Sequence, residues 1–256
     1  MRVSSLAFRS GAVSSVVEQE AFNLLVEGSN PSRPTIFQVS NSRLPQSSQS
    51  DVHPRLAETL ERHFAAPWRQ PVRAHSRQAF ASVEKRARDH PRIVLDSGCG
   101  TGRSTARLAE GHPDALVLGI DQSRHRLSKA PLMPDNAQLV RANLADFWRL
   151  ALAKNWRLDA HYLLYPNPWP KPGHLQRRWH AHPVFPELLR LGGQLEIRSN
   201  FYLYLKEFCC ALRHGGVADG EVVSFHPEFP ISPFEAKYSA SGHELFRLTV
   251  LLETTA

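Results

Sequence analysis

A proline-rich segment carries residue types that could bind a ligand. It runs from Tyr162 to Lys171, as Tyr-Leu-Leu-Tyr-Pro-Asn-Pro-Trp-Pro-Lys, and begins as an apolar strand. Prolines on both sides of Asn167 and Trp169 leave the backbone little freedom. An amide, an aromatic ring and an ammonium group are therefore held in fixed relative positions. Open parallel sheets bind ligands at this end of their strands, so we interpret the segment as part of a site and not as a solvated turn.

Cationic side chains follow this loop. The charged and titratable residues of the run are Lys171, His174, Arg177, Arg178 and His180. The stretch from Arg124 to Lys129 adds further cations, and the whole chain of 256 residues has a formal net charge of +7. This balance favours a polyanionic partner, with nucleic acid ahead of a membrane surface. The alternative is that these cations are only solvated at the surface and bind no partner.

A second candidate site is a glycine-rich turn after a buried strand, with the spacing Asp96-x-Gly98-x-Gly100-x-Gly102. Glycines let the backbone lie against a ligand, and the N-terminus of the following helix offers free N–H groups to a carboxylate. A dinucleotide-binding turn would have its third glycine at residue 103, which is Arg. The spacing instead resembles the S-adenosylmethionine loop of class I methyltransferases.

Asp121 ends the next predicted strand, residues 115–121. An acid at this position can accept hydrogen bonds from both hydroxyls of a ribose. Helix capping is the alternative role for both Asp96 and Asp121, and we favour cofactor binding.

The composition limits the class of protein. With 42% hydrophobic residues, the chain can build one sizeable core, so one domain with an extension is the simplest organisation. No apolar run is long enough to cross a bilayer. Cys99, Cys209 and Cys210 provide neither a disulfide framework nor a CxxC metal spacing, which fits a reducing cytoplasm and predicts no metal site.

The first fifty residues differ from the rest, since twelve of them are serine and their hydrophobic periodicity is weak. We expect residues 1–50 to be a disordered or mis-assigned extension. The sequence Gly28-Ser-Asn-Pro-Ser-Arg-Pro34 is similar to the conceptual translation of the T arm of a tRNA gene, which places the expected true start downstream. Residues 51–256 are then the folded domain, with a helical lead-in over residues 51–90.

Apolar strands alternate with helical stretches along the domain. This alternation predicts a doubly wound, mostly parallel α/β sheet. The seven expected strands lie near residues 91–97, 115–121, 137–141, 160–165, 193–199, 222–225 and 245–252.

The glycine loop, Asp121 and the Pro-Asn-Pro-Trp sequence together resemble the bacterial tRNA (guanine-N7)-methyltransferase family, from about Pro91 to Leu251. Residues 165–178 are the most specific part, because they are similar to the family's Pro-Asp-Pro-Trp followed by Lys, His and Arg-Arg. Smaller similarities are Leu191-Gly-Gly193, Ser232-Pro-Phe-Glu235 and Gly242-His243. The resemblance implies a Rossmann-like, seven-stranded class I methyltransferase sheet with a C-terminal antiparallel hairpin.

The resemblance also implies an activity and a site. The activity is transfer of a methyl group from S-adenosylmethionine to N7 of a guanosine in tRNA, at position 46 of the variable loop, by a cytoplasmic monomer or homodimer. The implied cofactor-binding residues are Asp96, Gly98, Gly100, Gly102, Asp121 and Asn143. The implied substrate-binding residues are Trp169, Lys171, Arg177, Arg178, Asn200, Ser232 and Glu235, and Asn167 occupies the catalytic position.

Three of these positions are Asn where the family has Asp: Asn143, Asn167 and Asn200. Guanine N7 is a free lone pair and needs no deprotonation before it attacks a methyl group. A carboxylate at residue 167 would therefore anchor the base, and an amide offers only one uncharged acceptor, so we expect weaker anchoring. Glu235 is expected to retain part of that role.

Two other functions stay open on the sequence. The first is a divergent paralogue that methylates another RNA or a small substrate. The second is an inactive RNA-binding module that keeps the fold and the basic face. Binding of the cofactor without methyl transfer to any RNA would favour the second.

Overall fold

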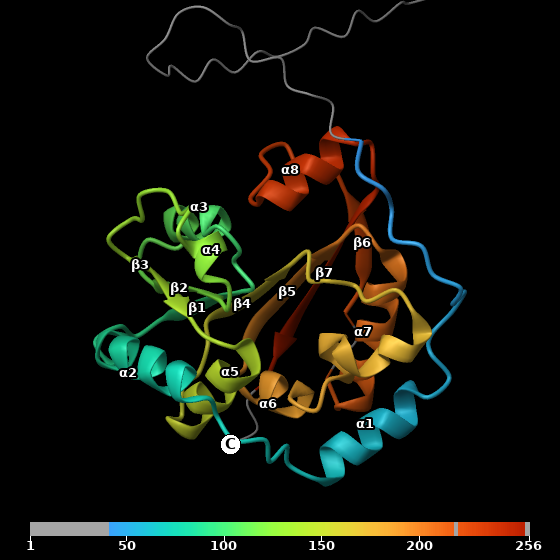
Figure 1. Cartoon of the computed structure of the whole chain (residues 1–256), viewed down its shortest axis with the longest axis horizontal. Helices are drawn as coiled ribbons and strands as arrows, with labels where there is room; N and C mark the ends of the chain where they lie inside the picture. Colours follow the sequence, from blue (N-terminus) through green and yellow to red (C-terminus); the bar gives the residue numbers. More distant parts are fainter. Residues whose placement is uncertain (1–40, 218–219, 254–256) are drawn as a thin grey trace, which may run out of the picture. The chain divides into compact units, whose positions relative to one another are not determined.

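Seven strands form one sheet in the described part of the chain, residues 41–217 and 220–253 of the computed structural model. The strands are β1 (Ile93–Ser97), β2 (Leu116–Asp121), β3 (Ala137–Arg141), β4 (Ala160–Leu164), β5 (Gly193–Ser199), β6 (Val222–Phe225) and β7 (Leu245–Leu252). Their order is β3-β2-β1-β4-β5-β7-β6 (Figure 1).

The first five strands are parallel, and β7 runs antiparallel to both β5 and β6. The predicted doubly wound α/β sheet with an antiparallel C-terminal pair is therefore confirmed. A helix, and not a tight turn, connects β6 to β7. Every residue of β1 and β2 is buried, as expected for strands covered on both faces.

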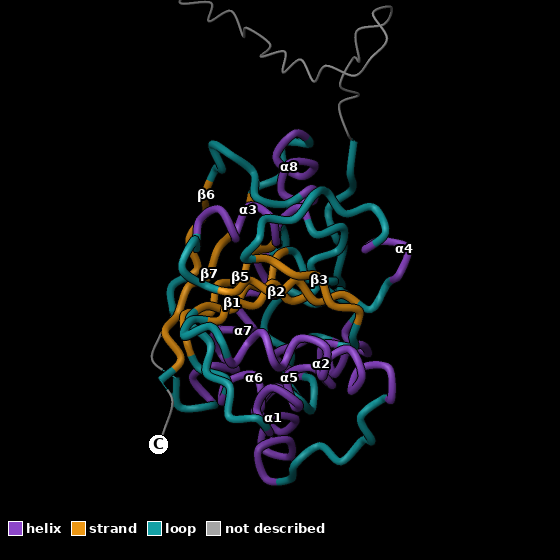
Figure 2. Tube along the Cα trace, turned by 90° about the vertical axis from the view of Figure 1, so that its left-hand side faces the viewer, coloured by secondary structure: helices purple, strands orange, loops and turns teal. Residues whose placement is uncertain are grey.

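Helices cover both faces of the sheet. They are α1 (Leu56–Ala65), α2 (Ala74–Arg88), α3 (Arg103–Gly111), α4 (Arg124–Leu127), α5 (Leu144–Ala153), α6 (Phe185–Arg190), α7 (Tyr202–His214) and α8 (Pro233–Ala240). Two 3-10 helices, η1 (Pro172–Arg177) and η2 (Trp179–Ala181), follow the proline-rich loop. Figure 2 shows α1, α2, α5, α6 and α7 on one side of the sheet, with α3 and α8 on the other.

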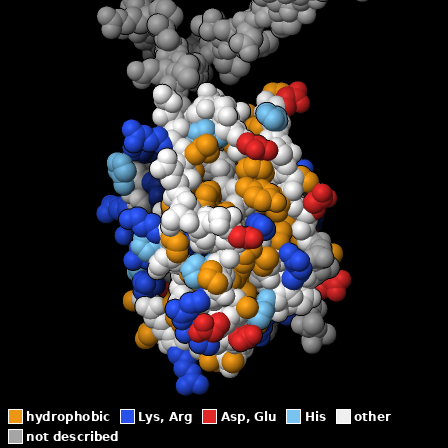
Figure 3. All heavy atoms as spheres, turned by 90° about the vertical axis from the view of Figure 1, so that its right-hand side faces the viewer, with side chains coloured by type: hydrophobic (Ala, Val, Ile, Leu, Met, Phe, Trp, Pro, Cys, Tyr) orange, Lys and Arg blue, Asp and Glu red, His pale blue; other side chains and the backbone are white. Residues whose placement is uncertain are grey.

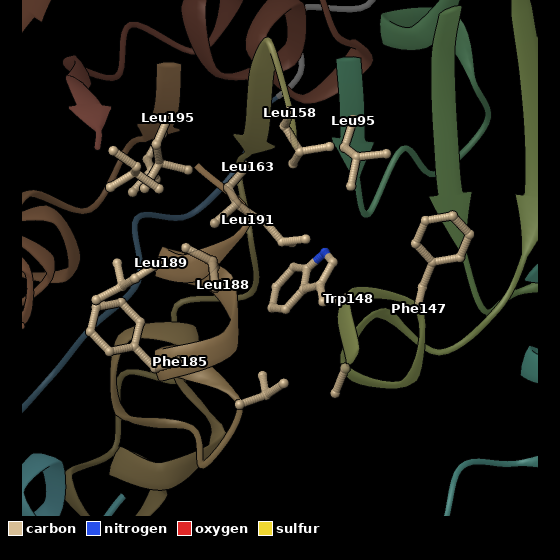
Figure 4. Close-up of a cluster of buried hydrophobic side chains, with 14 of the residues drawn as sticks. Leu95, Phe147, Trp148, Leu158, Leu163, Phe185, Leu188, Leu189, Leu191 and Leu195 are labelled. Atoms are coloured by element: carbon tan, nitrogen blue, oxygen red, sulfur yellow. The ribbon is translucent and has the colours of Figure 1, made fainter. Parts of the chain in front are cut away.

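The larger hydrophobic cluster joins the sheet to one helical layer. Trp148 of α5 lies among Leu95 and Leu163 of the strands and Leu188 and Leu191 of the α6 region (Figure 4). All five side chains are fully buried. This close packing fixes the sheet against the helical layer. The carboxyl ends of the strands, which carry the candidate residues, are therefore held in fixed positions.

Neighbouring strands bring the candidate residues to one edge. The order β2-β1-β4-β5 places the carboxyl ends of four parallel strands side by side. Asp121 ends β2, the glycine loop follows β1, the proline-rich loop follows β4, and Asn200 follows β5. The topology thus assembles both predicted sites where doubly wound sheets bind ligands.

The last ten residues of the expected N-terminal extension, 41–50, belong to the described part of the chain. Residues 41–50 contact the domain, because Ser47 donates a hydrogen bond to the carbonyl of Pro170 (2.6 Å) and Gln49 donates one to Glu207 (2.6 Å). The sequence predicts a disordered or mis-assigned extension over residues 1–50, and the serine-rich composition gave no sign of these contacts. The tRNA-gene-like sequence at residues 28–34 lies outside the described residues.

Candidate functional site

Two glycines of the loop after β1 have different physical roles. Gly100 has φ of 59°, and a Cβ there would meet no heavy atom within 4 Å, so the loop borders open space where a ligand can lie. Gly102, at φ of 75°, is closed in, since a Cβ would lie 2.8 Å from Leu139 Cδ1. The loop is tied to β2 by the hydrogen bond from Gly98 N to Ile120 O (2.8 Å).

Asp96 is buried beneath this loop. Its Oδ2 accepts hydrogen bonds from the hydroxyls of Ser104 and Thr105, both at 2.7 Å. Its Oδ1 is buried without a hydrogen-bond partner among the described residues. Burial raises the pKa of Asp96 to about 6, although the two hydroxyls lower it in part. A buried carboxylate oxygen without a donor can bind the ammonium group of an amino acid. Because Asp96 is only 1% exposed, such a ligand reaches it only after the glycine loop has moved.

Asp121 connects the glycine loop to α4. Gly100 N donates to its Oδ2 (3.0 Å), and Ser123 N donates to its Oδ1 (2.7 Å). Arg126 Nη2 also donates to Oδ1, at 2.8 Å. A ribose hydroxyl at Oδ1 would compete with Arg126, whose side chain is 49% exposed and can move into solvent.

Asn143 caps helix α5. Its Oδ1 accepts a hydrogen bond from Asp146 N (3.2 Å), which satisfies one of the free donors of the first turn. The capping bond uses the carbonyl oxygen, so the amide nitrogen is the group that can face an adenine. A cofactor role for Asn143 stays a prediction.

The proline-rich loop after β4 holds an unusual backbone. Tyr165 and Trp169 have φ of 52° and 44°, in the left-handed region that side-chain-bearing residues rarely adopt. Asn167 is exposed, and its Oδ1 accepts a hydrogen bond from Trp169 N (3.2 Å). Strained backbone of this kind clusters at ligand sites. The loop presents Asn167 to solvent, and its rigidity stays a prediction.

Trp169 forms an aromatic platform with η1. The Arg177 guanidinium lies over its ring at 4.9 Å, and the His174 ring meets it edge-on at 5.5 Å. A cavity of about 400 Å³ lies beside this platform, and its lining includes Arg177, His174, His53 and Arg55. Lys171, at the start of η1, is exposed. These side chains can contact an anionic polymer.

Arg178 is predicted to bind substrate, and the structure gives it a buried, structural position instead of an exposed one. Its side chain is only 1% exposed and pairs with the buried Glu207 at 2.5 Å. The guanidinium also donates to the carbonyls of Trp169 (3.2 Å) and Lys171 (3.4 Å). Arg178 therefore stabilises the loop by binding its backbone carbonyls. Its buried guanidinium is not accessible to a phosphate group in this structure.

Glu207 is held as a carboxylate by its neighbours. Burial alone would raise its pKa, but hydrogen bonds from His180, Gln49 and Arg178 lower the pKa to about 2. Burial lowers the pKa of His180. A carboxylate only accepts, so His180 carries a proton on Nε2, which lies 3.0 Å from Glu207 Oε2.

Glu235 and Ser232 lie at the start of α8. Ser232 caps the helix through a hydrogen bond from Glu235 N to its Oγ (3.1 Å). The Glu235 carboxylate is fully buried and accepts from Arg198 Nη1 at 2.8 and 3.1 Å. Burial raises the pKa of Glu235, and Arg198 opposes that rise. Direct contact of either residue with a base stays a prediction, and both have structural partners here.

Asn200 is 7% exposed and faces His243. The distance from its Nδ2 to His243 Nδ1 is 3.0 Å, and His243 Nε2 lies 2.8 Å from the carbonyl of Ser42. A carbonyl only accepts, so a neutral His243 carries its proton on Nε2 and accepts at Nδ1. The amide of Asn200 must then present Nδ2 to the ring, which leaves Oδ1 as an acceptor without a donor among the residues that the structure describes.

Sequence reasoning missed several residues that shape the site. Arg198 bridges Glu196 (2.6 Å) and Glu235. The two opposite charges at alternate positions of β5, Glu196 and Arg198, were a usable signal. Ser104 and Thr105, in the first turn after the glycine loop, were a second signal. Gln49 and Glu207 gave no local signal, because their importance arises only from contacts between distant segments.

Comparison with known proteins identifies the family. The profile of a family described as putative methyltransferases matches residues 90–248, which is more than half of the chain. The chain belongs to this methyltransferase family. The matched region contains the glycine loop, Asp121, the proline-rich loop and α8.

Individual tRNA methyltransferases are similar to this chain over part of their length. A protein of Mycobacterium ulcerans (strain Agy99) named tRNA (guanine-N(7)-)-methyltransferase is 31% identical over 57% of this chain and 54% of its own. Proteins of the same name from Aquifex aeolicus (strain VF5) and Lactobacillus acidophilus are 27% and 28% identical, over 58% and 85% of their lengths. The chain thus spans little more than half the length of the first two relatives.

A solved structure shows the same fold. The 16S rRNA methyltransferase KamB aligns with a TM-score of 0.50 and 17% identity, covering 72% of this chain and 95% of the other. At this identity the likeness concerns the fold alone, which is that of class I methyltransferases.

The observed residues fit the cofactor of such methyltransferases, S-adenosylmethionine. The Oδ1 of Asp96, which has no donor among the described residues, suits the ammonium group once the glycine loop has moved, and the open space beside Gly100 suits close approach of the ligand. Asp121 can accept from the ribose once Arg126 has moved. When bound, the cofactor supplies an electrophilic methyl group.

Proposed function

We propose that the protein transfers the methyl group of S-adenosylmethionine to N7 of a guanosine in tRNA, with position 46 of the variable loop as the target. One observation carries the proposal: the glycine loop and the strained Pro-Asn-Pro-Trp loop open on the same edge of the sheet, on the neighbouring strands β1 and β4. The names of the relatives from three bacteria support the choice of base and RNA.

The chain's own residues position the base. Guanine N7 already carries a lone pair, so no residue has to remove a proton before attack. The rate then depends on in-line alignment of N7 with the methyl group. Asn167 can accept one hydrogen bond from the guanine edge through its exposed amide, and Trp169 offers a face on which an extruded base can stack.

Cations on the same side contact the RNA backbone. Lys171 and Arg177 are exposed beside the loop, and the neighbouring cavity adds Arg55 and His53. In Figure 3, Lys and Arg side chains gather along one edge of the face that is shown. This distribution, with the net charge of +7, supports a polyanionic partner.

Assembly and location belong to the same proposal. We propose a monomer or homodimer that acts in the cytoplasm, where tRNA is modified. In the described part of the chain, no helix is long and apolar enough to cross a membrane.

Transfer of label from S-adenosylmethionine to bulk tRNA, followed by nucleoside analysis, tests the proposal. Label in N7-methylguanosine is expected, and Asp121→Ala should reduce cofactor affinity by about 1–3 kcal/mol because ribose hydroxyls lose their acceptor. Label in a different nucleoside would favour a divergent paralogue. That alternative has one specific support, the amides at Asn143, Asn167 and Asn200. Cofactor binding without label in any RNA would favour an inactive RNA-binding module.

A further inference from the structure

The segment of residues 42–49, called the strap here, contacts both the turn after α8 and the proline-rich loop. Figure 1 shows it in blue, running from beside α8 past α7 to α1. One end of the strap meets the turn after α8, and the other end meets the proline-rich loop. The chain between these contacts is short, so the strap links two parts of the site that lie about seventy residues apart in sequence.

The first contact fixes Asn200 through His243. The carbonyl of Ser42 accepts from His243 Nε2 at 2.8 Å, and the Ser42 hydroxyl donates to Ser241 Oγ at 3.0 Å. Because the Ser42 carbonyl cannot donate, it selects the tautomer of His243 that accepts from Asn200. A backbone atom of the strap thereby sets which end of the Asn200 amide is free.

The second contact fixes the proline-rich loop. Ser47 Oγ donates to the carbonyl of Pro170 at 2.6 Å. Gln49 Oε1 accepts from both Nη atoms of Arg178, at 3.2 Å each, while its Nε2 donates to Glu207 Oε1 at 2.6 Å. The same guanidinium donates to the carbonyls of Trp169 and Lys171. By accepting from this guanidinium, Gln49 fixes the group that binds the backbone at Trp169.

We propose that the strap is a positioning segment of the substrate side, which holds the Pro-Asn-Pro-Trp loop and Asn200 in fixed relation to each other. This inference rests on the proposed function for its catalytic consequence, but its structural content is independent. Gln49, Ser47 and Ser42 act through other residues and do not touch substrate. The glycine loop and Asp121 have no part in these contacts, so the cofactor site is separate from them.

The test uses three variants of the full chain: Gln49→Ala, the milder Ser47→Ala, and Ser48→Ala as the matched control, since Ser48 is exposed. Hydrogen–deuterium exchange reports on the loop without any activity. Exchange of residues 165–178 should rise by about tenfold or more in Gln49→Ala, because a buried guanidinium loses an acceptor, and by less in Ser47→Ala. Exchange of residues 96–102 should stay unchanged, and so should cofactor affinity by calorimetry.

Kinetics give the second readout. With tRNA as substrate, Gln49→Ala should raise KM or lower kcat/KM by about tenfold or more, while KM for the cofactor stays within about twofold. If both strap variants match Ser48→Ala in loop exchange, the proposal is wrong. If the wild-type protein methylates no tRNA, the proposed function fails, and the exchange comparison still decides the role of the strap.

Discussion

The carboxyl group of Asp96 is buried beneath the glycine loop, and one of its oxygens has no donor among the described residues. Burial raises its pKa to about 6. An ammonium group binds the ionised carboxylate, and the ionised fraction grows as pH rises through this pKa. Cofactor affinity should therefore rise by up to about tenfold per pH unit below pH 6 and reach a plateau above it. Calorimetry between pH 5 and pH 8 measures this profile.

Asp96→Asn is the control for that prediction. An amide does not titrate in this range, so the variant should bind the cofactor weakly and with no rise around pH 6. A flat profile in the wild-type protein would show that Asp96 does not meet the ammonium group.

Asn167 stands where the family that this chain resembles has Asp. If that acid anchors the base and does not remove a proton, Asn167→Asp should raise the rate of methyl transfer to tRNA. The gain should correspond to about 1–3 kcal/mol, the difference between a charge-assisted hydrogen bond and a neutral one. Single-turnover rates at saturating cofactor measure it. If the wild-type protein is inactive and Asn167→Asp does not raise the rate of methyl transfer, the site serves a function other than tRNA methylation.

Helix η1 and the residue that follows it show how one basic run divides into two roles. Arg177 is exposed over Trp169, whereas Arg178 is buried against Glu207. Arg177→Ala should lower the salt dependence of tRNA affinity by about one unit of slope and leave the melting temperature unchanged. Binding assays at several salt concentrations measure this.

The companion variant Arg178→Ala should act on stability. It would leave the Glu207 carboxylate buried without its cation, which costs on the order of 3–5 kcal/mol of unfolding free energy. Thermal and denaturant unfolding measure the loss. Equal melting temperatures for the two variants would contradict the division of roles seen in the structure.

At the scale of the whole domain, Trp148 joins the sheet to a helical layer. It is fully buried, and its Nε1 donates to Ser97 Oγ at 3.0 Å. Trp148→Ala should lower the unfolding free energy by about 3–5 kcal/mol, through lost burial and the remaining cavity. Denaturant unfolding with a constant m-value gives this quantity.

Trp169→Ala is the matched control, since the same side chain is removed from a loop at the surface. Its stability cost should be about 1 kcal/mol or less, while tRNA affinity falls because a stacking face is lost. A large stability loss at Trp169 would mean that the loop is part of the core.

The sequence by itself determined the strands and the candidate ligand edge. All seven expected strands occur, with ends within two residues of those expected. The signal was strongest for β1 and β2, which are buried throughout and are therefore nearly continuous apolar runs. The Asp96 to Gly102 turn and Asp121 could be placed as well. Their positions follow from local chain order, and a right-handed βαβ connection leaves few alternatives. The short helices α6 and α8 have too few turns to show a clear period and were not anticipated.

Only the tertiary structure decided which side chains are available for binding. Arg177 and Arg178 are adjacent and alike in sequence, but Glu207 and Gln49 bury the second of them. Asn200 and Glu235 were chosen because the sequence resembles a family motif at these positions. Their hydrogen-bond partners, His243 and Arg198, determine which of their polar atoms are left to bind a ligand. Burial and hydrogen-bond pairing arise from contacts between distant segments, so no local pattern contains them. The serine-rich strap is the clearest case, since its composition predicts disorder and its contacts with Pro170 and Glu207 hold it in place.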